Sequence, residues 1–332
     1  MNPMWGMMSG LGDQYRWAAD LVPPPVPRAE TVLVCGMGGS GISGDMAAAA
    51  IPSALVAVNK GYTLPGWVAG LRPLVIAVSY SGNTEETRSV VEDALALELP
   101  VAVVAGGGAL GDLADQRRLP IIRVPTGLQP RAALGYLTGG VLRLLESAGV
   151  AGEQVEALQE ASSVVGELWG EGRSGPAGRL ALDLADGLAG RISLIYGSTG
   201  LTAPVAQRWK TQINENGKRP AFWSVLPELD HNEIVGWSAL ESLTRRSVGV
   251  VLLRDRDEHP QVGRRFALTT NLIAEKVPVV GEVWSQGDSR VARIASLALI
   301  GDLASVHLAE QEGIDPVPVE VIEHLKVLLN EE

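Results

Sequence analysis

Short apolar runs alternate with longer amphipathic segments along most of this chain. The runs are rich in Val and Ile, as in strands buried in a parallel sheet. The expected strands are Thr31–Cys35, Leu55–Val58, Leu74–Ser79, Val101–Val104, Ile121–Val124, Ile192–Tyr196, Ala221–Val225, Val248–Leu253 and Val279–Val283. The expected helices lie near Ile42–Ile51, Glu85–Leu97, Ala132–Ser147, Ala203–Asn216, Pro260–Ala274, Val291–Ala309 and Val319–Leu329. This alternation predicts an α/β fold with parallel sheets.

The strands and helices fall into two series, separated by the mostly helix-forming stretch Gly149–Ser174. We therefore predict two domains, residues 1–152 and residues 153–332. The segments VLVCGMGGSG and SLIYGSTGLT form a faint repeat, because each is a strand that runs into a Gly/Ser turn and then a helix. Only the first copy keeps dense glycines, so we assign anion binding to the first domain and other chemistry to the second.

Composition narrows the range of partners. The chain has 332 residues, a formal net charge of −11 and no run of Lys or Arg. Because nucleic acids and anionic membranes bind basic patches, we expect neither as a partner. The single cysteine excludes a disulfide framework within one chain, and the N-terminal segment lacks the pattern of a signal peptide. A soluble, cytoplasmic protein is expected.

A glycine-rich loop, Gly36–Gly41, follows the first expected strand and opens a helix. Such a loop lets the backbone approach a phosphate and directs helix N–H groups at it. It also has the G-x-G-x-x-G spacing of dinucleotide-binding proteins. Those proteins carry an acidic residue at the end of the second strand, where this chain has Val58-Asn59-Lys60. The loop therefore favours a phosphate over a dinucleotide.

A second loop, Ser79–Thr87, also follows an apolar strand and precedes a helix. The first and third strands of a parallel sheet end at the same edge, so hydroxyls from both loops can converge on one anion. Helix capping explains either loop alone as well as phosphate binding does, but two such loops favour phosphate. The predicted phosphate-binding residues are Gly38, Gly39, Ser40, Ser79, Ser81 and Thr84.

Four motifs together resemble one family. GMGGSGISGD, SYSGNTEET, NENGKRPAFWSVLPELDHNEIVGW and GIDPVPVEVIEHLK occur in this order and are similar to the sugar isomerase (SIS) fold, in particular to the bifunctional phosphoglucose/phosphomannose isomerases. The resemblance implies two tandem SIS-type αβα sandwiches with parallel, flavodoxin-like sheets. It implies an aldose–ketose isomerase that interconverts glucose 6-phosphate, and mannose 6-phosphate, with fructose 6-phosphate through a cis-enediolate. It also implies a homodimer that needs neither a metal nor a cofactor.

The resemblance assigns the catalytic base to Glu215 and the cation for the enediolate to Arg131, in GLQPRAALGY. Glu215 precedes Asn216-Gly217, which is typical of a helix C-terminus, where the helix dipole disfavours the ionised carboxylate. That environment suits a base that works near neutral pH. From spacing alone, a solvated glutamate at a helix end and an arginine in a surface loop remain the simpler interpretations.

A histidine follows in LPELDHNEIVGW, where Asp230 and Glu233 have the spacing of a capping box. This spacing predicts that His231 lies in the first turn of a helix, where the helix dipole keeps the imidazole neutral. The resemblance implies that His231 opens the sugar ring and comes from the neighbouring subunit. A solvent-facing histidine in a loop is the alternative.

The last expected helix carries a lysine on its apolar face. Val319, Ile322, Lys326 and Leu329 share that face, so Lys326 is predicted to lie on a buried stripe. The resemblance implies that this lysine reaches the active site. A lysine that only complements the dipole at the helix C-terminus is the alternative.

The histidines are scattered without the spacing of metal ligands, at His231, His259, His307 and His324, so no metal site is expected. Two positions depart from the family pattern, because His307 replaces an aromatic residue and Val317 a threonine. The second departure weakens the expectation of activity on mannose 6-phosphate. Two other functions remain open: a non-catalytic sugar-phosphate sensor on the same fold, and a nicotinamide-dependent oxidoreductase.

Overall fold

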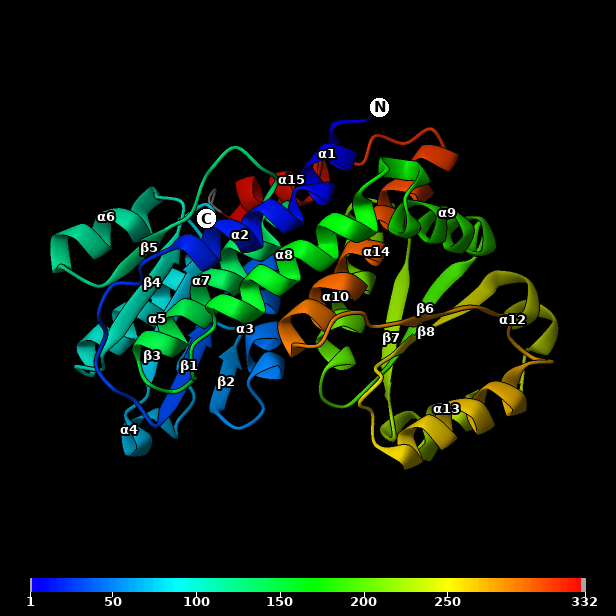
Figure 1. Cartoon of the computed structure of the whole chain (residues 1–332), viewed down its shortest axis with the longest axis horizontal. Helices are drawn as coiled ribbons and strands as arrows, with labels where there is room; N and C mark the ends of the chain where they lie inside the picture. Colours follow the sequence, from blue (N-terminus) through cyan, green and yellow to red (C-terminus); the bar gives the residue numbers. More distant parts are fainter. Residues whose placement is uncertain (1, 330–332) are drawn as a thin grey trace.

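The chain forms two parallel β-sheets, one in each half of the sequence (Figure 1). The computed structural model describes residues 2–329. The first sheet has the order β2-β1-β3-β4-β5, with β1 Thr31–Cys35, β2 Leu55–Asn59, β3 Leu74–Ser79, β4 Val101–Ala105 and β5 Ile121–Arg123. The second has the order β7-β6-β8-β9, with β6 Ile192–Ser198, β7 Ala221–Leu226, β8 Val248–Arg254 and β9 Val279–Trp284. All paired strands are parallel, which confirms the α/β fold with flavodoxin-like sheets.

Helices and short 3₁₀ turns connect the strands. In the first half they are α1 Pro3–Ser9, α2 Leu11–Asp20, α3 Gly38–Ala50, α4 Val68–Leu71, α5 Glu85–Ala96, α6 Gly108–Arg117, η1 Pro130–Ala132 and α7 Leu134–Ser147. In the second half they are α8 Val155–Trp169, η2 Gly172–Ser174, α9 Pro176–Leu188, α10 Thr202–Glu215, η3 Glu228–His231, α11 Glu233–Gly236, α12 Glu241–Ser247, α13 Pro260–Ile273, α14 Arg290–Gln311 and α15 Glu320–Leu329. The expected strands and helices are all present, and among them the largest difference in bounds is that α3 begins at Gly38.

The first sheet is covered on both faces, which makes this half a three-layer sandwich. Val32 and Val34 of β1 enter the core that holds α3 and α7, whereas Leu33 and Cys35 enter the core that holds α5 and α6. Successive side chains of a strand point to opposite faces of a sheet, so an uninterrupted apolar strand fills both cores. This is why β1 reads as a continuous apolar run.

A layer of helices joins the two halves. α8 packs against α2 and α14, and α10 packs against α3 and α14. One buried cluster runs through this layer from Val34 of the first sheet to Trp209 of α10 and Val306 of α14. α14 is long and apolar enough to cross a membrane, but 94% of that stretch is buried inside the protein, as in a core helix.

The division into residues 1–152 and 153–332 stays a prediction, because α8 contacts both halves of the molecule. Residue 1 and residues 330–332, the outermost residues of the two predicted domains, lie outside the described residues. Helices α4, α6, α9, α11 and α12 were not among the expected elements, and neither were α1 and α2. The first two are held by buried side chains such as Trp5 and Tyr15, although glycines interrupt their sequence.

Candidate active site

The two phosphate-type loops meet at the carboxyl edge of the first sheet. β2 and β3 lie on opposite sides of β1, so the loops after β1 and β3 flank the switch point where ligands of such sheets bind. The N–H of Tyr80 donates to Ser40 Oγ at 3.3 Å, and Ser79 Oγ and Thr84 Oγ1 are hydrogen-bonded at 2.9 Å. The exposed Ser81 lies on the same loop. The structure thus brings these hydroxyls together, while their role in binding phosphate stays a prediction.

Helix capping accounts for only part of this polar cluster. Thr84 is the N-cap residue of α5, but its hydroxyl bonds to Ser79 Oγ. Ser40 lies in the first turn of α3, and its hydroxyl accepts from the loop after β3. Both helices begin at this edge of the sheet, so their first N–H groups lie there together with the hydroxyls. Donors of both kinds around one edge suit an anion.

The glycine-rich loop lies directly against the segment that carries Arg131. Gly38 has a φ of +51°, which favours glycine. A Cβ added at Gly39 would lie 3.2 Å from the carbonyl oxygen of Pro130 and 3.5 Å from the Cα of Arg131. A side chain at position 39 would therefore push the loop away from Arg131. The predicted phosphate site and the predicted cation are neighbours.

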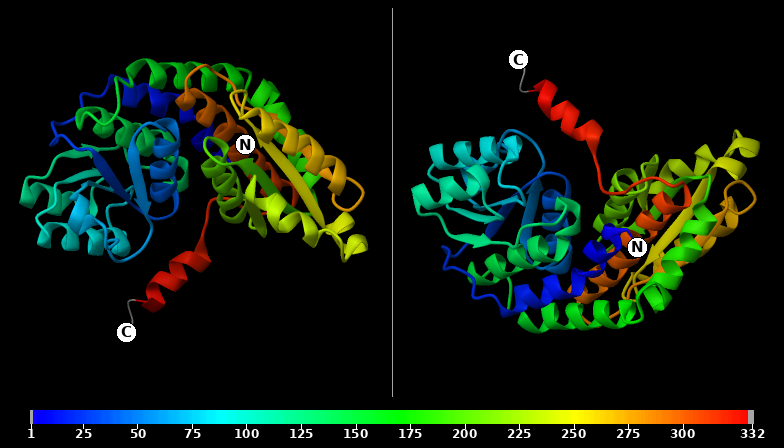
Figure 2. Two further views of the ribbon diagram at one scale, coloured as in Figure 1. Left: turned by 90° about the horizontal axis from the view of Figure 1, so that it is seen from below. Right: turned by 90° about the horizontal axis from the view of Figure 1, so that it is seen from above.

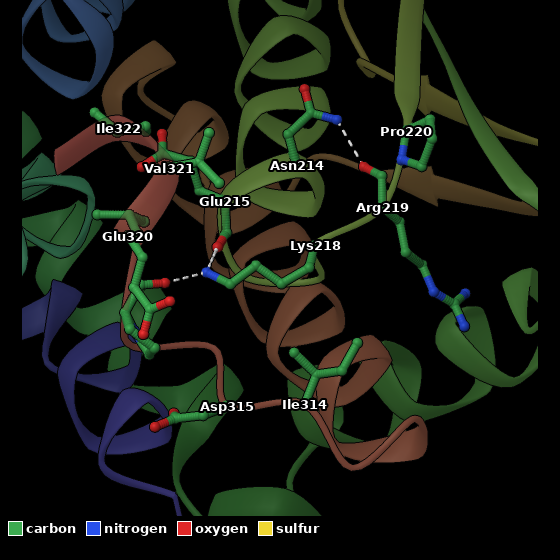
Figure 3. A pocket seen from close by; sticks show the side chains of 12 residues that line it. Asn214, Glu215, Lys218, Arg219, Pro220, Ile314, Asp315, Glu320, Val321 and Ile322 are labelled. Atoms are coloured by element: carbon green, nitrogen blue, oxygen red, sulfur yellow. Dashed lines mark hydrogen bonds between the residues drawn. The ribbon is translucent and has the colours of Figure 1, made fainter. Parts of the chain in front are cut away.

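Arg131 in turn faces Glu215, at the C-terminal end of α10. Arg131 Nη1 lies 3.8 Å from Glu215 Oε2, and the side chains are 4% and 30% exposed, respectively. Glu215 also lines a cavity of about 660 Å³ whose walls include Lys218, Pro220, Ile314 and other residues up to the start of α15 (Figure 3). A carboxylate beside a fixed cation and open to a cavity is the arrangement that proton transfer next to a developing negative charge requires.

The guanidinium of Arg131 is held by oxygen atoms from the second half of the chain. Nε donates to Asn216 Oδ1 at 2.6 Å, and Nη2 donates to the carbonyl oxygens of Pro316 and Val317 at 2.7 and 2.8 Å. Nη1 donates to Gln129 Oε1 at 3.3 Å. Burial lowers the pKa of Arg131 from its ordinary value, and the carboxylate of Glu215 opposes that shift. The cation is therefore rigidly oriented at the junction of the two halves.

Lys218 is a second cation at this site, and our sequence analysis did not identify it. Figure 3 shows its side chain between the end of α10 and the segment that leads to α15. Its ammonium donates to the carbonyl oxygens of Glu215, Pro316 and Pro318. Burial, and next the charge of Arg131, lower the pKa of Lys218. Its signal in the sequence was a lysine just after a helix C-terminus, where such side chains bond the last carbonyls.

A buried ion pair contacts the backbone of Arg131. Arg208 of α10 binds Asp302 of α14 through Nε–Oδ1 at 2.9 Å and Nη2–Oδ2 at 2.6 Å, and these side chains are 2% and 3% exposed. Arg208 Nη2 and Gln212 Nε2 both donate to the carbonyl oxygen of Arg131, at 2.9 and 3.3 Å. Charges at this depth must be paired. The sequence signal, charges that interrupt the apolar faces of two core helices, was visible but was missed.

The predicted capping box around His231 is wrong. Asp230 and His231 belong to the 3₁₀ turn η3, and the cap of α11 is Asn232, whose Oδ1 accepts from the N–H of Glu233 at 2.6 Å. The Asp230 carboxylate instead accepts hydrogen bonds from an arginine and a threonine of α13, at 2.8 and 2.7 Å. These tertiary partners override the local spacing. His231 is therefore the last residue of η3, and it is exposed.

Glu215 and His231 lie at opposite ends of β7. Glu215 precedes this strand. The turn from the end of α10 to the start of β7 is closed by a 2.8 Å hydrogen bond from Asn214 Nδ2 to the carbonyl oxygen of Arg219. His231 follows β7 at the carboxyl edge of the second sheet. A six-residue strand spans roughly 17 Å from its first to its last Cα at 3.3 Å per residue. Within one subunit, the predicted base and the predicted ring-opening histidine therefore lie far apart.

Lys326 lies on α15, and its predicted place on a buried stripe is wrong for the single chain. All of α15 is exposed, including Ile322 at 41% and Leu325 at 55%. Figure 2 shows this helix (red) projecting from the rest of the molecule. Its start lines the same cavity as Glu215, through Glu320 and Val321. The amphipathic pattern indicated the helix correctly but not that the chain itself leaves it uncovered.

Two proteins similar to this chain are bifunctional phosphoglucose/phosphomannose isomerases. A bifunctional phosphoglucose/phosphomannose isomerase of Caldicellulosiruptor bescii is 38% identical over 309 residues, which are 91% of this chain and 90% of that protein. A protein of the same name from Aquifex aeolicus is 36% identical and covers 98% of both chains. The chain belongs to this family. It is therefore an isomerase, like the bifunctional phosphoglucose/phosphomannose isomerases of that family.

The match to this isomerase family extends to its domains and fold. Residues 177–329 match the model of the bacterial phospho-glucose isomerase C-terminal SIS domain. A hypothetical protein of Thermus thermophilus has a TM-score of 0.74 at 16% identity, over 98% of this chain and 90% of that one. A putative phosphosugar isomerase of Clostridium difficile 630 has a TM-score of 0.66 at 14% identity, over 98% and 94%. The predicted tandem SIS fold is confirmed.

Among residues 2–329, no three His, Cys, Asp or Glu side chains gather as metal ligands. Metal independence nevertheless stays a prediction. The structure places the cations Arg131 and Lys218 beside Glu215.

Proposed function

We propose that this chain interconverts glucose 6-phosphate, and mannose 6-phosphate, with fructose 6-phosphate through a cis-enediolate, without a metal ion. The observation that carries the proposal is the 3.8 Å approach of the Arg131 guanidinium to the Glu215 carboxylate, beside the loops of the first sheet. The names of its relatives support the substrates. The site then has a phosphate-binding end and a proton-transfer end.

The loops Gly36–Gly41 and Ser79–Thr87 hold the phosphate of the substrate. The N–H groups of Gly38 and Gly39 at the start of α3, the Ser40 hydroxyl and the hydroxyls of the second loop supply the donors. A protein with a net charge of −11 needs such local donors, because its overall field repels an anion. With the phosphate fixed there, the other end of the sugar extends toward Arg131, which contacts the loop at Gly39.

Glu215 carries the proton between the two carbon atoms. It takes the proton from C2 of the open-chain aldose, which leaves an enediolate with its charge on O1. A proton then moves from the O2 hydroxyl to O1, and Glu215 returns its proton to C1, which gives the ketose. The guanidinium of Arg131 stabilises the negative charge that develops on the enediolate oxygens. Glucose and mannose 6-phosphates differ only at C2, and removal of the C2 proton gives both the same enediolate. One base and one cation therefore serve both substrates.

Ring opening requires a proton carrier, and the predicted one, His231, lies at the other end of β7 from Glu215 within one subunit. We propose a homodimer in which His231 of each subunit completes the site of the other. The exposure of His231 and its place at the far end of β7 support this arrangement. Lys326 joins the site when α15, whose first turn borders the cavity, closes over it.

The test is to assay Glu215→Gln with all three sugar phosphates, with and without a chelator. We expect the variant to lose at least about a hundredfold in kcat, since general base catalysis contributes about 10² to 10⁴. Glu320→Gln, which changes another carboxylate of the same cavity, is the matched control and should stay active. Near-normal turnover by a folded Glu215→Gln protein would exclude this base. Binding without proton exchange at C2 would instead indicate a sugar-phosphate sensor.

A further inference from the structure

The hydrogen bonds of Arg131 fix two nitrogen atoms of its guanidinium and leave the third directed at Glu215. Nε and Nη2 are engaged by three oxygen atoms at 2.6 to 2.8 Å. Nη1 has only a longer bond of 3.3 Å to Gln129 among the described residues, and it is the nitrogen that faces Glu215. Because the guanidinium is planar and rigid, fixing two of its nitrogens sets the direction of the third.

The acceptor of the shortest of these bonds is the side-chain oxygen of Asn216. This side chain is completely buried, and its Nδ2 donates to Ser305 Oγ at 2.9 Å, while the Ser305 hydroxyl donates to the carbonyl oxygen of Asp302 at 2.6 Å. Since the serine proton is already used, the serine oxygen can only accept from the amide. The amide orientation is therefore determined, and its oxygen must face Arg131.

Asn216 also occupies a particular place in the chain. It directly follows Glu215 and is the C-cap of α10, where its N–H donates to the carbonyl oxygen of Gln212 at 2.7 Å. Arg131 comes from the segment before α7, in the first half of the chain. One buried amide thus connects the helix end that carries the proposed base with the proposed cation.

We propose that Asn216 is a positioning residue for the isomerisation: its amide oxygen orients Arg131 so that Nη1 points at the enediolate oxygens beside Glu215. The inference rests on the proposed function, because it assumes that Arg131 acts on the reacting atoms. Without the amide oxygen, Nε loses its acceptor and the guanidinium can rotate about the contacts of Nη2. A misplacement of about 1 Å can slow catalysis about a hundredfold.

The test is a double-mutant cycle of Asn216→Ala and Arg131→Ala, read as kcat and KM for fructose 6-phosphate. We expect Asn216→Ala to lower kcat about 10- to 100-fold and to change KM less than about threefold. In the Arg131→Ala background the same substitution should change kcat less than about threefold, because its target is gone. A purely structural role would lower the yield or the unfolding midpoint but would not depend on Arg131.

Two further variants make the cycle decisive. Asn216→Asp keeps the shape and the acceptor, so it should fold and keep kcat within about tenfold even if Asn216→Ala is unstable. Thr211→Ala, which removes a 2.9 Å bond to the carbonyl oxygen of Arg208 within the same helix, is the control and should keep normal kcat.

These variants distinguish a failure of the positioning role of Asn216 from a failure of the proposed function. Equal losses from Asn216→Ala in both backgrounds, or an Asn216→Asp protein as slow as Arg131→Ala, would overturn the positioning role alone. Normal kcat for Arg131→Ala would instead overturn the role of Arg131 in the proposed function.

Discussion

Arg131 and Glu215 lie 3.8 Å apart, although 83 positions of sequence and two different sheets separate them. The contact exists because α10 crosses from the second sheet to pack against α3 of the first. The end of α10 therefore arrives beside the loop that precedes α7. The candidate site therefore belongs to neither half alone.

The hydroxyl of Thr84 is expected to bind the substrate's phosphate. Thr84→Val keeps the shape of the side chain and removes the hydroxyl that bonds Ser79. We expect KM for each sugar phosphate to rise about 10- to 100-fold, with kcat nearly unchanged, since a hydrogen bond to a charged group contributes about 1.5–3 kcal/mol. Thr87→Val, three residues on in the first turn of α5, is the matched control, because Thr87 Oγ1 is buried without a hydrogen-bond partner in the part of the chain that the structure describes. Equal KM values for both variants would contradict the assignment.

The buried pair of Arg208 and Asp302 should matter greatly for stability. Asp302→Ala leaves the guanidinium of Arg208 buried without its carboxylate, which typically costs about 3–5 kcal/mol. Urea unfolding should show a loss of this size. Asp288→Ala, which breaks the exposed pair of Arg256 and Asp288, should cost less than about 1 kcal/mol. If the two variants proved equally stable, the buried pair would not be the anchor that its geometry indicates.

Cys35 should make the protein less stable at high pH. Burial raises the pKa of its thiol from 9.0 to about 12. The unfolded chain loses this proton near pH 9, whereas the folded chain keeps it until about pH 12. Folding then binds a proton, so between these values the free energy of unfolding falls with rising pH, by up to about 1.4 kcal/mol per pH unit.

The measurement is urea unfolding at several pH values, with Cys35→Ala as the comparison. The variant should lack this part of the slope, so the difference between the two proteins must change between pH 9 and pH 12. A constant difference would refute the shift. The native thiol should also react slowly with a thiol reagent at pH 8 and fully after unfolding, because the thiolate is the reactive form.

The composite site can be tested by mixing two inactive variants. Glu215→Gln and His231→Ala should each be nearly inactive alone. In a mixed dimer, one site combines both substitutions, and the other has intact Glu215 and His231. Random mixing makes half of the dimers mixed, so about a quarter of the normal activity should return. The measurement is kcat after co-expression or refolding together. Activity that stays at the level of the separate variants would exclude a shared site.

The fold was largely predictable because its signals are local. Strands such as β1 and β3 are buried on both faces, so their sequences are uninterrupted apolar runs. The glycines and hydroxyls of the two loops follow those strands directly, and the rule for parallel sheets then places them at one edge. Among the expected helices, the start of α3 was missed by a full turn, because Gly38 and Gly39 do not resemble helical residues.

The proton-transfer end was not predictable from local pattern. Glu215 and Arg131 were found through the family resemblance, and nothing near Arg131 in the sequence indicates its partners, Asn216 and Pro316. The same limit explains the failure at Asp230, whose partners lie on α13. Lys326 shows a different limit, because an apolar stripe predicts that a helix face is covered but does not identify what covers it.

The carbonyl oxygens of Pro316, Val317 and Pro318 are all held by Arg131 or Lys218. This clamp fastens the base of α15 at the point where the two halves of the molecule meet. Any motion that pulls α15 outward or separates the two halves therefore breaks the hydrogen bonds of Arg131 and Lys218 first. These are the bonds that orient both cations at the site. Heat should thus abolish turnover at a lower temperature than the one at which either sheet unfolds.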